Sequence, residues 1–594
     1  MKTSTAIFTG TFVALCLLAL ITGCSSAGSG NQGAGATPAD LATGRIVAKL
    51  DWGSASKATE KTVESAPTGV ATVRIIITGT GITTSIQKDF AASAGTGTIE
   101  GVPVGTGRTL TAQGLDASGM ITYQGTAANI TVQAGVTSNA GTITMTVRTV
   151  GLMLNNSSKT FPGYTLFAPK QNTMTYLINN EGRIIHKWTA SKYPPGQSVY
   201  LLEDGHLLRT CMTLGKLSSG GGEGGRVEEY DWDDNLVWSL DFSTDTYMQH
   251  HDIRRLPNGN ILMLVIEKKT YNEAIAAGFN PAKFQPEIAQ KGMMLPDYVV
   301  EIQPTKPVGG KVVWEWHTWD HLIQDYDSTK LNYGVVKSHP ELVSTAGDQK
   351  NLPAFWNHMN SIDYNPALDQ IALSVRGNSE VWIIDHSTTT AEAKGHSGGK
   401  RGKGGDLLYR WGNPITYGAG TASDQRYFQQ HDVEWVRSDC PGAGNLTCFN
   451  NGLGRGDYST VDEFTPAINS DGSYLIISGA AFTPKDLTWT YKGTSTNPMY
   501  SENISGAHRL PNGNTIICSG TVGQFLEVTS TGEIAWKYIC PVDQYGPITQ
   551  GSLPPADPAR TGETMNSVFR VYKYPLDYAA FEGKTLTPGD YVEK

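Results

Sequence analysis

The sequence lacks several motifs that define well-known enzyme classes. It contains no His-Glu-x-x-His, Cys-x-x-Cys or Cys-x-x-Cys-His pattern. These absences argue against a zincin-type metal site, a paired-thiolate site and covalently attached haem. A Gly-x-x-x-x-Gly-Lys-Ser/Thr loop and a Cys/Ser-x-Pro-x-Arg core are also missing, so neither a P-loop nor a formylglycine sulfatase is indicated.

Charge is scarce as well. Only 17% of the 594 residues are charged, the net charge is −9, and no long Lys/Arg block occurs. Nucleic acid is therefore not an expected partner. The chain is instead rich in glycine, with 67 residues, and in tyrosine and tryptophan, which is typical of an all-β protein with many turns. Its length requires two or more domains or one large repeat fold.

The N-terminus predicts export. Residues 6–21 form an apolar run that is short for a spanning helix, so residues 1–24 are expected to be a signal peptide. The run ends in Leu-Ile-Thr-Gly-Cys, which resembles a bacterial lipobox and implies that Cys24 is lipidated. Ser25 after it favours the outer membrane, facing the periplasm. Residues 25–42 are expected to be a flexible tether. A plain cleaved signal peptide is the alternative.

The remaining cysteines suggest disulfides, which the export route permits. Cys440 and Cys448 close a short loop and are the expected pair. Cys518 and Cys540 could form a second bridge, leaving Cys211 free, but connectivity cannot be read from sequence.

Residues 43–150 predict a small Ig-like β-sandwich. Short segments that alternate apolar residues with Thr, Ser or Gly follow one another at regular spacing. The region contains no histidine and no cysteine, so it offers few catalytic groups. A spacer or interaction module is the expected role.

A different repeat fills residues 160–594. A strand, a turn and a second strand ending in tryptophan recur, and each unit is followed by a further strand pair. Such four-strand units predict a six-bladed β-propeller as the catalytic domain, with seven blades as the alternative. The segment Met565–Pro575 is expected to close the last blade. The repeat tryptophans are Trp188, Trp238, Trp316, Trp411, Trp489 and Trp536.

Four histidines stand where a new strand begins after such a unit: His251, His358, His431 and His508. Equivalent starts of the inner strands face one mouth of a propeller channel, so we expect these side chains to converge. His250 precedes one of them and should face away, because side chains alternate along a strand.

The neighbours of His358 indicate which ligand such a cluster would bind. Asn360 lies two residues later on the same strand face, and Arg376 ends the next strand. A guanidinium beside imidazoles disfavours a metal cation and suits a multiply oxygenated anion such as a sulfate or phosphate ester. Imidazole can also attack or exchange a proton near neutral pH. No metal site is therefore predicted.

Two glycine-rich stretches are similar in composition to ligand-binding loops. Gly220 to Gly225 spell Gly-x-Gly-x-x-Gly, but the stretch precedes a strand rather than a helix, so it does not indicate a dinucleotide site. Residues 396–406 are expected to be a solvated loop.

One motif resembles a known family. His-x-Asn-Ser-Ile-x-Tyr-Asn-Pro at residues 358–366, followed by Ser-Val-Arg at 374–376, resembles the bacterial arylsulfate sulfotransferases, and so does Phe-Gln-Gln-His-Asp-Val-Glu-Trp at 428–435. The resemblance covers roughly residues 160–575. It implies an exported six-bladed propeller that moves a sulfuryl group from a phenolic sulfate ester to another phenol, with no nucleotide sulfate donor and no cofactor.

The resemblance also implies roles for individual residues. His431 resembles the nucleophile that carries the sulfuryl group as a sulfohistidine in a ping-pong mechanism. His251 and His358 resemble the groups that bind the sulfate oxygens and handle the phenolic proton. Asn360 and Arg376 would hold the equatorial oxygens.

The family pattern assigns no role to His508, which is kept as a substrate-binding candidate lining the channel. The implied partners are aryl sulfates and phenols, with membrane contact only through the lipid anchor and a homodimer left open. Two alternatives remain: a non-catalytic envelope scaffold, and a propeller oxidoreductase with a bound quinone or metal.

Overall fold

The computed structural model describes residues 42–53, 65–94, 97–213, 217–218, 220–346, 352–456, 458–475, 477 and 479–594. Cys24 and the expected signal peptide lie outside these residues, so export and lipid anchoring stay predictions. No helix among the described residues is long and apolar enough to cross a membrane. The prediction of an all-β chain is confirmed: strands dominate, and the helices α1 (Tyr271–Ala276), α2 (Pro286–Lys291) and α3 (Thr390–Ala393) are short.

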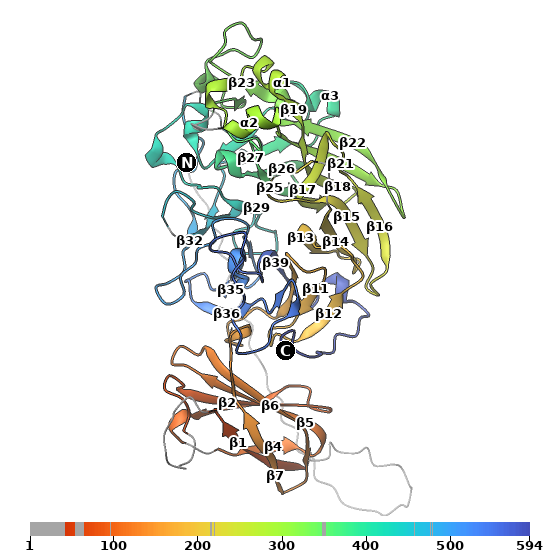
Figure 1. Ribbon diagram of the computed structural model, residues 1–594, viewed down its shortest axis with the longest axis vertical. Helices are drawn as coiled ribbons and strands as arrows, with labels where there is room; N and C mark the ends of the chain where they lie inside the picture. The colour runs from red at the N-terminus through yellow and green to blue at the C-terminus, as the bar shows by residue number, and fades with distance from the viewer. Residues whose placement is uncertain are drawn as a thin grey trace, which may run out of the picture.

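The first eight strands form two sheets that pack against each other (Figure 1). One core joins them, because Ile46 and Val102 of the smaller sheet cluster with Ile77 and Leu110 of the larger. The smaller sheet has the order β4 (Ile99–Pro103), β1 (Thr43–Asp51), β7 (Thr137–Thr144), and the larger has the order β3 (Ile86–Ala91), β2 (Thr72–Thr78), β5 (Gly105–Leu115), β6 (Ile121–Val132), β8 (Thr146–Val147).

The described residues after Val150 form six larger antiparallel sheets. The first contains β39 (Val568–Pro575), β10 (Gly163–Pro169), β11 (Thr175–Ile178) and β12 (Ile184–Trp188), and the second β13 (Pro195–Leu201), β14 (Leu207–Met212), β15 (Gly225–Tyr230) and β16 (Leu236–Asp241). The third contains β17 (Tyr247–Arg255), β18 (Ile261–Glu267), β21 (Asp297–Pro304) and β22 (Gly310–His317), and the fourth β25 (Met359–Asn365), β26 (Gln370–Val375), β27 (Glu380–Asp385) and β28 (Tyr409–Trp411). The fifth contains β29 (His431–Trp435), β30 (Leu446–Asn450), β31 (Thr460–Phe464) and β32 (Trp489–Tyr491), and the sixth β33 (Gly506–Arg509), β34 (Thr515–Ser519), β35 (Gln524–Val528), β36 (Ile534–Ile539) and β9 (Gly151–Asn155).

The innermost strand of each sheet contacts the innermost strand of the next. In order they are β39, β13, β17, β25, β29 and β33, and β33 contacts β39 again. The six strands therefore close a ring, around which the sheets are arranged (Figure 1). Residues far apart in the sequence can meet at the centre of this ring, which is called the hub below.

The recurring tryptophans join neighbouring sheets. Each lies on the fourth strand of its sheet and donates its indole N–H to a backbone carbonyl between the third and fourth strands of the following sheet. Trp188 donates to Asp231 at 3.0 Å, and Trp536 of the sixth sheet donates to Asn180 of the first at 2.8 Å. The other four donate in the same way to Gly309, Gly405, Pro484 and Ser530. The repeat seen in the sequence thus marks the contacts between sheets.

The ring closes differently from the prediction. Met565–Pro575 was expected to complete the last sheet, but β39 pairs with β10 in the first sheet. The sixth sheet receives β9 on its outer edge instead, from the segment that precedes the first sheet. Strands from both ends of this region therefore bridge the seam, which ties the first and last sheets together.

Candidate functional site

Backbone irregularities at the starts of three inner strands shape the site. The pairing register shifts between Gln249 and Ile253 in β17, and similar shifts occur at the starts of β25 and β29. His251 and His358 adopt left-handed φ angles of 47° and 51°. Such conformations cost about 1–3 kcal/mol each in non-glycine residues and cluster at functional sites. They turn the imidazoles away from the ordinary strand alternation.

The structure brings His251, His358 and His431 together. The ring centroids of His251 and His358 lie 5.1 Å apart. Phe569 on β39 lies 6.0 Å from His251 and 6.5 Å from His431, so its ring stands between the strands. Phe355 stacks on His358 at 4.2 Å. Burial and the neighbouring positive charges hold the pKa of all three imidazoles well below the ordinary value.

Arg376 supplies a positive charge that has no carboxylate within ion-pair distance in the described part of the chain, although the charge of Glu502 acts on it from farther away. After burial, its charge is the largest cause that lowers the pKa of both His358 and His431. Its guanidinium Nε is buried with no hydrogen-bond partner among the described residues, and burial lowers its own pKa to about 10. A cavity of about 650 Å³ is lined by His358 and Arg376. A guanidinium that lines a cavity and is not paired with a described carboxylate is suited to an anionic ligand.

The nucleophile candidate is held in one tautomer. Asn451 Nδ2 donates to the carbonyls of Ser501 and Ile504 at 2.7 and 3.0 Å. This orients Asn451 Oδ1 toward His431 Nδ1, 2.7 Å away, so that Nδ1 must carry the hydrogen. The lone pair of His431 therefore lies on Nε2, which accepts a hydrogen bond from the Ile504 N–H at 3.2 Å. No pattern in the sequence pointed to Asn451.

Asn360 lies at the same hub. Its Nδ2 donates to the Gln430 carbonyl at 2.8 Å, while its Oδ1 is buried without a partner among the described residues. One of its two amide hydrogens is thus used within the protein.

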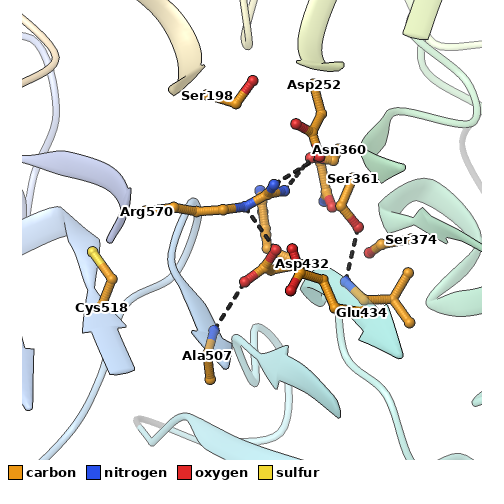
Figure 2. A network of polar contacts seen from close by, with 12 residues as sticks. Ser198, Asp252, Asn360, Ser361, Ser374, Asp432, Glu434, Ala507, Cys518 and Arg570 are labelled. Carbon is orange, nitrogen blue, oxygen red and sulfur yellow. Dashed lines mark hydrogen bonds and ion pairs between the residues drawn. The ribbon is translucent and has the colours of Figure 1, made fainter. Parts of the chain in front are cut away.

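Arg570 of β39 binds two carboxylates (Figure 2). Its Nη1 lies 2.7 Å from Asp252 Oδ2 and its Nε 2.8 Å from Asp432 Oδ1. The guanidinium also donates to the Asn360 carbonyl at 2.7 Å. Asp252 and Asp432 follow His251 and His431 directly, so this buried ion group fixes the strands that present the imidazoles.

The glycine-rich stretch forms a wall of the site. The backbone carbonyl of Gly222 accepts from the His251 N–H at 2.9 Å. A Cβ on Gly222 would lie 1.7 Å from His251 Cε1, and one on Gly221 would lie 3.5 Å from His358 Cε1. Glycine is therefore required where the loop meets the imidazoles, a role that the sequence did not reveal.

Gly222→Ala is expected to lower kcat/KM by about 10²-fold, because displacing a reacting group by about 1 Å has that effect. The matched control is Gly220→Ala. Its φ of 77° resembles the 69° of Gly222, but a Cβ added to Gly220 would meet no atom within 4 Å. Steady-state kinetics and thermal melting of both variants separate backbone strain from the clash. Equal activity of the two would contradict this role of Gly222.

His250 was expected to face away, and the structure places it beside the site. Its Nδ1 lies 2.8 Å from His251 Nδ1. The shifted register of β17 is the reason, since an extra residue in a strand disrupts the alternation of sides.

The predicted register of His508 was wrong. Arg254 and His508 each stand two residues before the leucine of a shared Leu-Pro-Asn-Gly-Asn turn, so Ser505 takes the place of His251. His508 Nδ1 lies 2.8 Å from Glu434 Oε2. It lines a separate cavity of about 810 Å³ together with Arg254.

The predicted Cys440–Cys448 disulfide is not formed, and both thiols are free and buried. Cys440 Sγ contacts the Arg509 carbonyl at 3.4 Å, while Cys448 Sγ contacts the His431 carbonyl at 3.2 Å. The two side chains thus pack against different neighbouring strands. Cys211, Cys518 and Cys540 are also free.

The described residues contain three groups of His, Asp and Glu close enough to hold a metal ion, and none includes His251, His358 or His431.

Comparison with known proteins identifies one family. The sequence model described as "Arylsulfotransferase (ASST)" matches residues 148–543, more than half of the 594 residues. No curated protein sequence matches the chain.

Several solved structures show limited similarity. A protein of unknown function from Bacteroides caccae is 10% identical over 69% of this chain and 98% of its own, with a TM-score of 0.35. Kuenenia stuttgartiensis hydrazine synthase is 14% identical over 64% and 90%, with a TM-score of 0.30. The Pseudomonas aeruginosa periplasmic gluconolactonase PpgL is 11% identical over 64% and 96%, with a TM-score of 0.31. Similarity at this level supports no conclusion about function.

Proposed function

Because the chain belongs to the arylsulfotransferase family, we propose that it moves a sulfuryl group from a phenolic sulfate ester to a phenolic acceptor, with His431 as the covalent carrier. One observation carries the proposal: a neutral imidazole of fixed tautomer stands near a guanidinium that has no ion-pair partner among the described residues. The first group can attack sulfur, and the second can hold the charged oxygens.

The fold in this proposal is a six-bladed β-propeller with the site at its hub. The closed ring of inner strands supports it, as do the six equivalent tryptophan contacts between successive sheets. The six sheets would be the blades, and β39 would join the two ends of the ring.

In the first half-reaction, His431 Nε2 gives up its hydrogen bond from the Ile504 N–H. Its lone pair attacks sulfur, and the bond from sulfur to the phenolic oxygen breaks. Charge spreads over three sulfate oxygens in a loose in-line transition state, as in phosphoryl transfer. Arg376, His358 and Asn360 would hold those oxygens. Fixed charges in a water-poor site stabilise such a state strongly. His251 would protonate the departing phenolate.

In the second half-reaction, a phenolic acceptor enters after the first phenol has left. His251 would take its proton, and the phenolate oxygen would attack the sulfur held on His431 Nε2. The nitrogen–sulfur bond breaks and the imidazole returns to its neutral form. One site thus serves two phenols in turn, which predicts ping-pong kinetics.

Incubation of the wild-type protein with an aryl sulfate, with and without a phenol, tests the proposal. Phenol release should accelerate when acceptor is added, and the sulfated acceptor should appear. Mass spectrometry of enzyme quenched without acceptor should find one added SO₃ group on the peptide that contains His431. A protein that releases phenol equally fast without acceptor would be a hydrolase instead.

A further inference from the structure

A line of buried groups runs from His251 through His250 to Asp297. His250 Nδ1 lies 2.8 Å from His251 Nδ1, with the two rings at 84°. On its other side, His250 Nε2 lies 2.8 Å from Asp297 Oδ1. His250 and Asp297 are fully buried, and Asp297 Oδ2 accepts from the Met359 N–H at 3.3 Å. Since His250 occupies Nδ1 of His251, only Nε2 remains for a ligand.

We propose that Asp297 and His250 form a proton relay that acts through His251 and stores the proton exchanged between the two half-reactions. The inference rests on the proposed function and deepens it. Neither residue touches the substrate in this scheme, so both are positioning residues for His251, which does.

The hydrogens can be arranged in two ways along this line. In the acid form, His250 carries hydrogens on both nitrogens and is paired with the Asp297 carboxylate. His251 then accepts at Nδ1 and donates from Nε2–H to the phenolic oxygen. When that proton leaves, the His250 Nδ1 hydrogen moves to His251 Nδ1.

The result is the base form. His250 is now neutral, keeps its hydrogen on Nε2, which lies 2.8 Å from the Asp297 carboxylate, and accepts from His251 Nδ1–H. His251 Nε2 holds a lone pair, which takes the proton of the incoming phenol in the second half-reaction. The chain of hydrogens then reverses. One proton leaves and one returns in each cycle, so no other donor or acceptor of protons is needed.

The three imidazoles differ in what lies behind them, and this difference assigns their roles. His431 Nδ1 is hydrogen-bonded to Asn451, a neutral amide, which suits a nucleophile that must stay uncharged. His358 stacks on Phe355. Of the three, only His251 is connected in the described structure to a carboxylate, that of Asp297, through His250. This carboxylate can stabilise a positive charge shared by His250 and His251. Environments that separate the protonation of neighbouring groups mark the acid–base member of a site.

The acidity of the departing phenol tests the relay. His250→Asn keeps a hydrogen-bonding atom near His251 Nδ1 but cannot pass a proton. We expect the variant to lose about 10²-fold in kcat/KM with phenyl sulfate, whose phenolate needs a proton, a loss in the range of general acid catalysis. With 4-nitrophenyl sulfate, whose phenolate leaves without help, the loss should stay below about tenfold.

Asp297→Asn should likewise reduce kcat/KM more with phenyl sulfate than with 4-nitrophenyl sulfate, because it removes the counter-charge and keeps the shape of the side chain. It also carries the test if His250→Asn does not fold, which thermal melting decides. The matched control is His321→Gln, because His321 is also fully buried and lies 2.9 Å from a carboxylate, that of Asp406, which lies outside the site. This control should leave the ratio of the kcat/KM values for the two donors unchanged.

The outcomes separate the two proposals. An active wild type whose His250 and Asp297 variants lose the same factor with every donor would overturn the relay and leave the sulfuryl transfer standing. A wild type that transfers no sulfuryl group would overturn both.

Discussion

Replacing His431 by alanine is expected to reduce sulfuryl transfer by at least about 10⁴-fold, since removal of a covalent nucleophile in other enzymes has effects of that size or larger. The loss should appear in kcat for every donor, because the covalent step is common to all of them. The quenched variant should carry no SO₃ group.

Binding should survive this change. Arg376 and His358 would still hold the sulfate group, so an inactive aryl sulfonate should bind the alanine variant with nearly unchanged affinity in calorimetry. The structural basis is that the two ring nitrogens of His431 bond to Asn451 and to the Ile504 N–H, and not to Arg376. The Arg376 Nε has no hydrogen-bond partner to lose in the described part of the chain. A variant that keeps even about a hundredth of the wild-type rate would argue against a histidine carrier.

His508→Gln is the matched control. It replaces another buried histidine that the sequence also placed in the channel, but one that the structure pairs with Glu434. Glutamine can keep a hydrogen bond to that carboxylate. Activity within about threefold of wild type is expected, which would also verify the corrected register of this strand.

The sequence predicted the repeating elements well, because each carries a local physical signal. A tryptophan such as Trp238 recurs since every sheet must contact the next through the same indole N–H and a carbonyl such as that of Gly309. Three histidines could be placed because they start equivalent strands. Arg376 could be assigned to the same site because it ends the strand that follows the strand of Asn360.

The remainder of the site depends on features that leave no periodic signal. A register shift in β17 turns His250 toward His251, against the expected alternation. Gly222 reaches the site from a different sheet, and Asn451 from the end of β30. The contact of Gly222 with His251 forms only when two sheets pack together, and the other two depend on local backbone geometry that the sequence pattern does not reveal. The shared PNGN turn led to the wrong placement of His508, because a histidine precedes the turn in both strands but at different distances from it.

The other large effect is expected at Arg570, which joins the inner strands β17, β25 and β29 to its own strand β39. It compensates two carboxylates, Asp252 and Asp432, that are almost fully buried. Arg570→Met should lower the free energy of unfolding by about 3–5 kcal/mol, because it leaves buried charge without a partner. Urea denaturation followed by tryptophan fluorescence measures this loss.

The pH dependence of that loss distinguishes uncompensated charge from lost packing. Burial raises the pKa of Asp432 from 3.8 to about 6 even though Arg570 opposes the shift. A carboxyl group whose pKa is higher in the folded than in the unfolded protein favours folding at low pH, and that contribution is lost as the pH rises from about 4 to about 6. Without Arg570 the folded pKa of Asp432 should rise further, so the variant should lose more stability at pH 8 than at pH 5.

Adding Asp252→Asn and Asp432→Asn to Arg570→Met removes the charges and should recover part of the stability at pH 8. A loss that is the same at both pH values, and is not relieved by the two asparagines, would mean that Arg570 acts by filling space rather than by its charge.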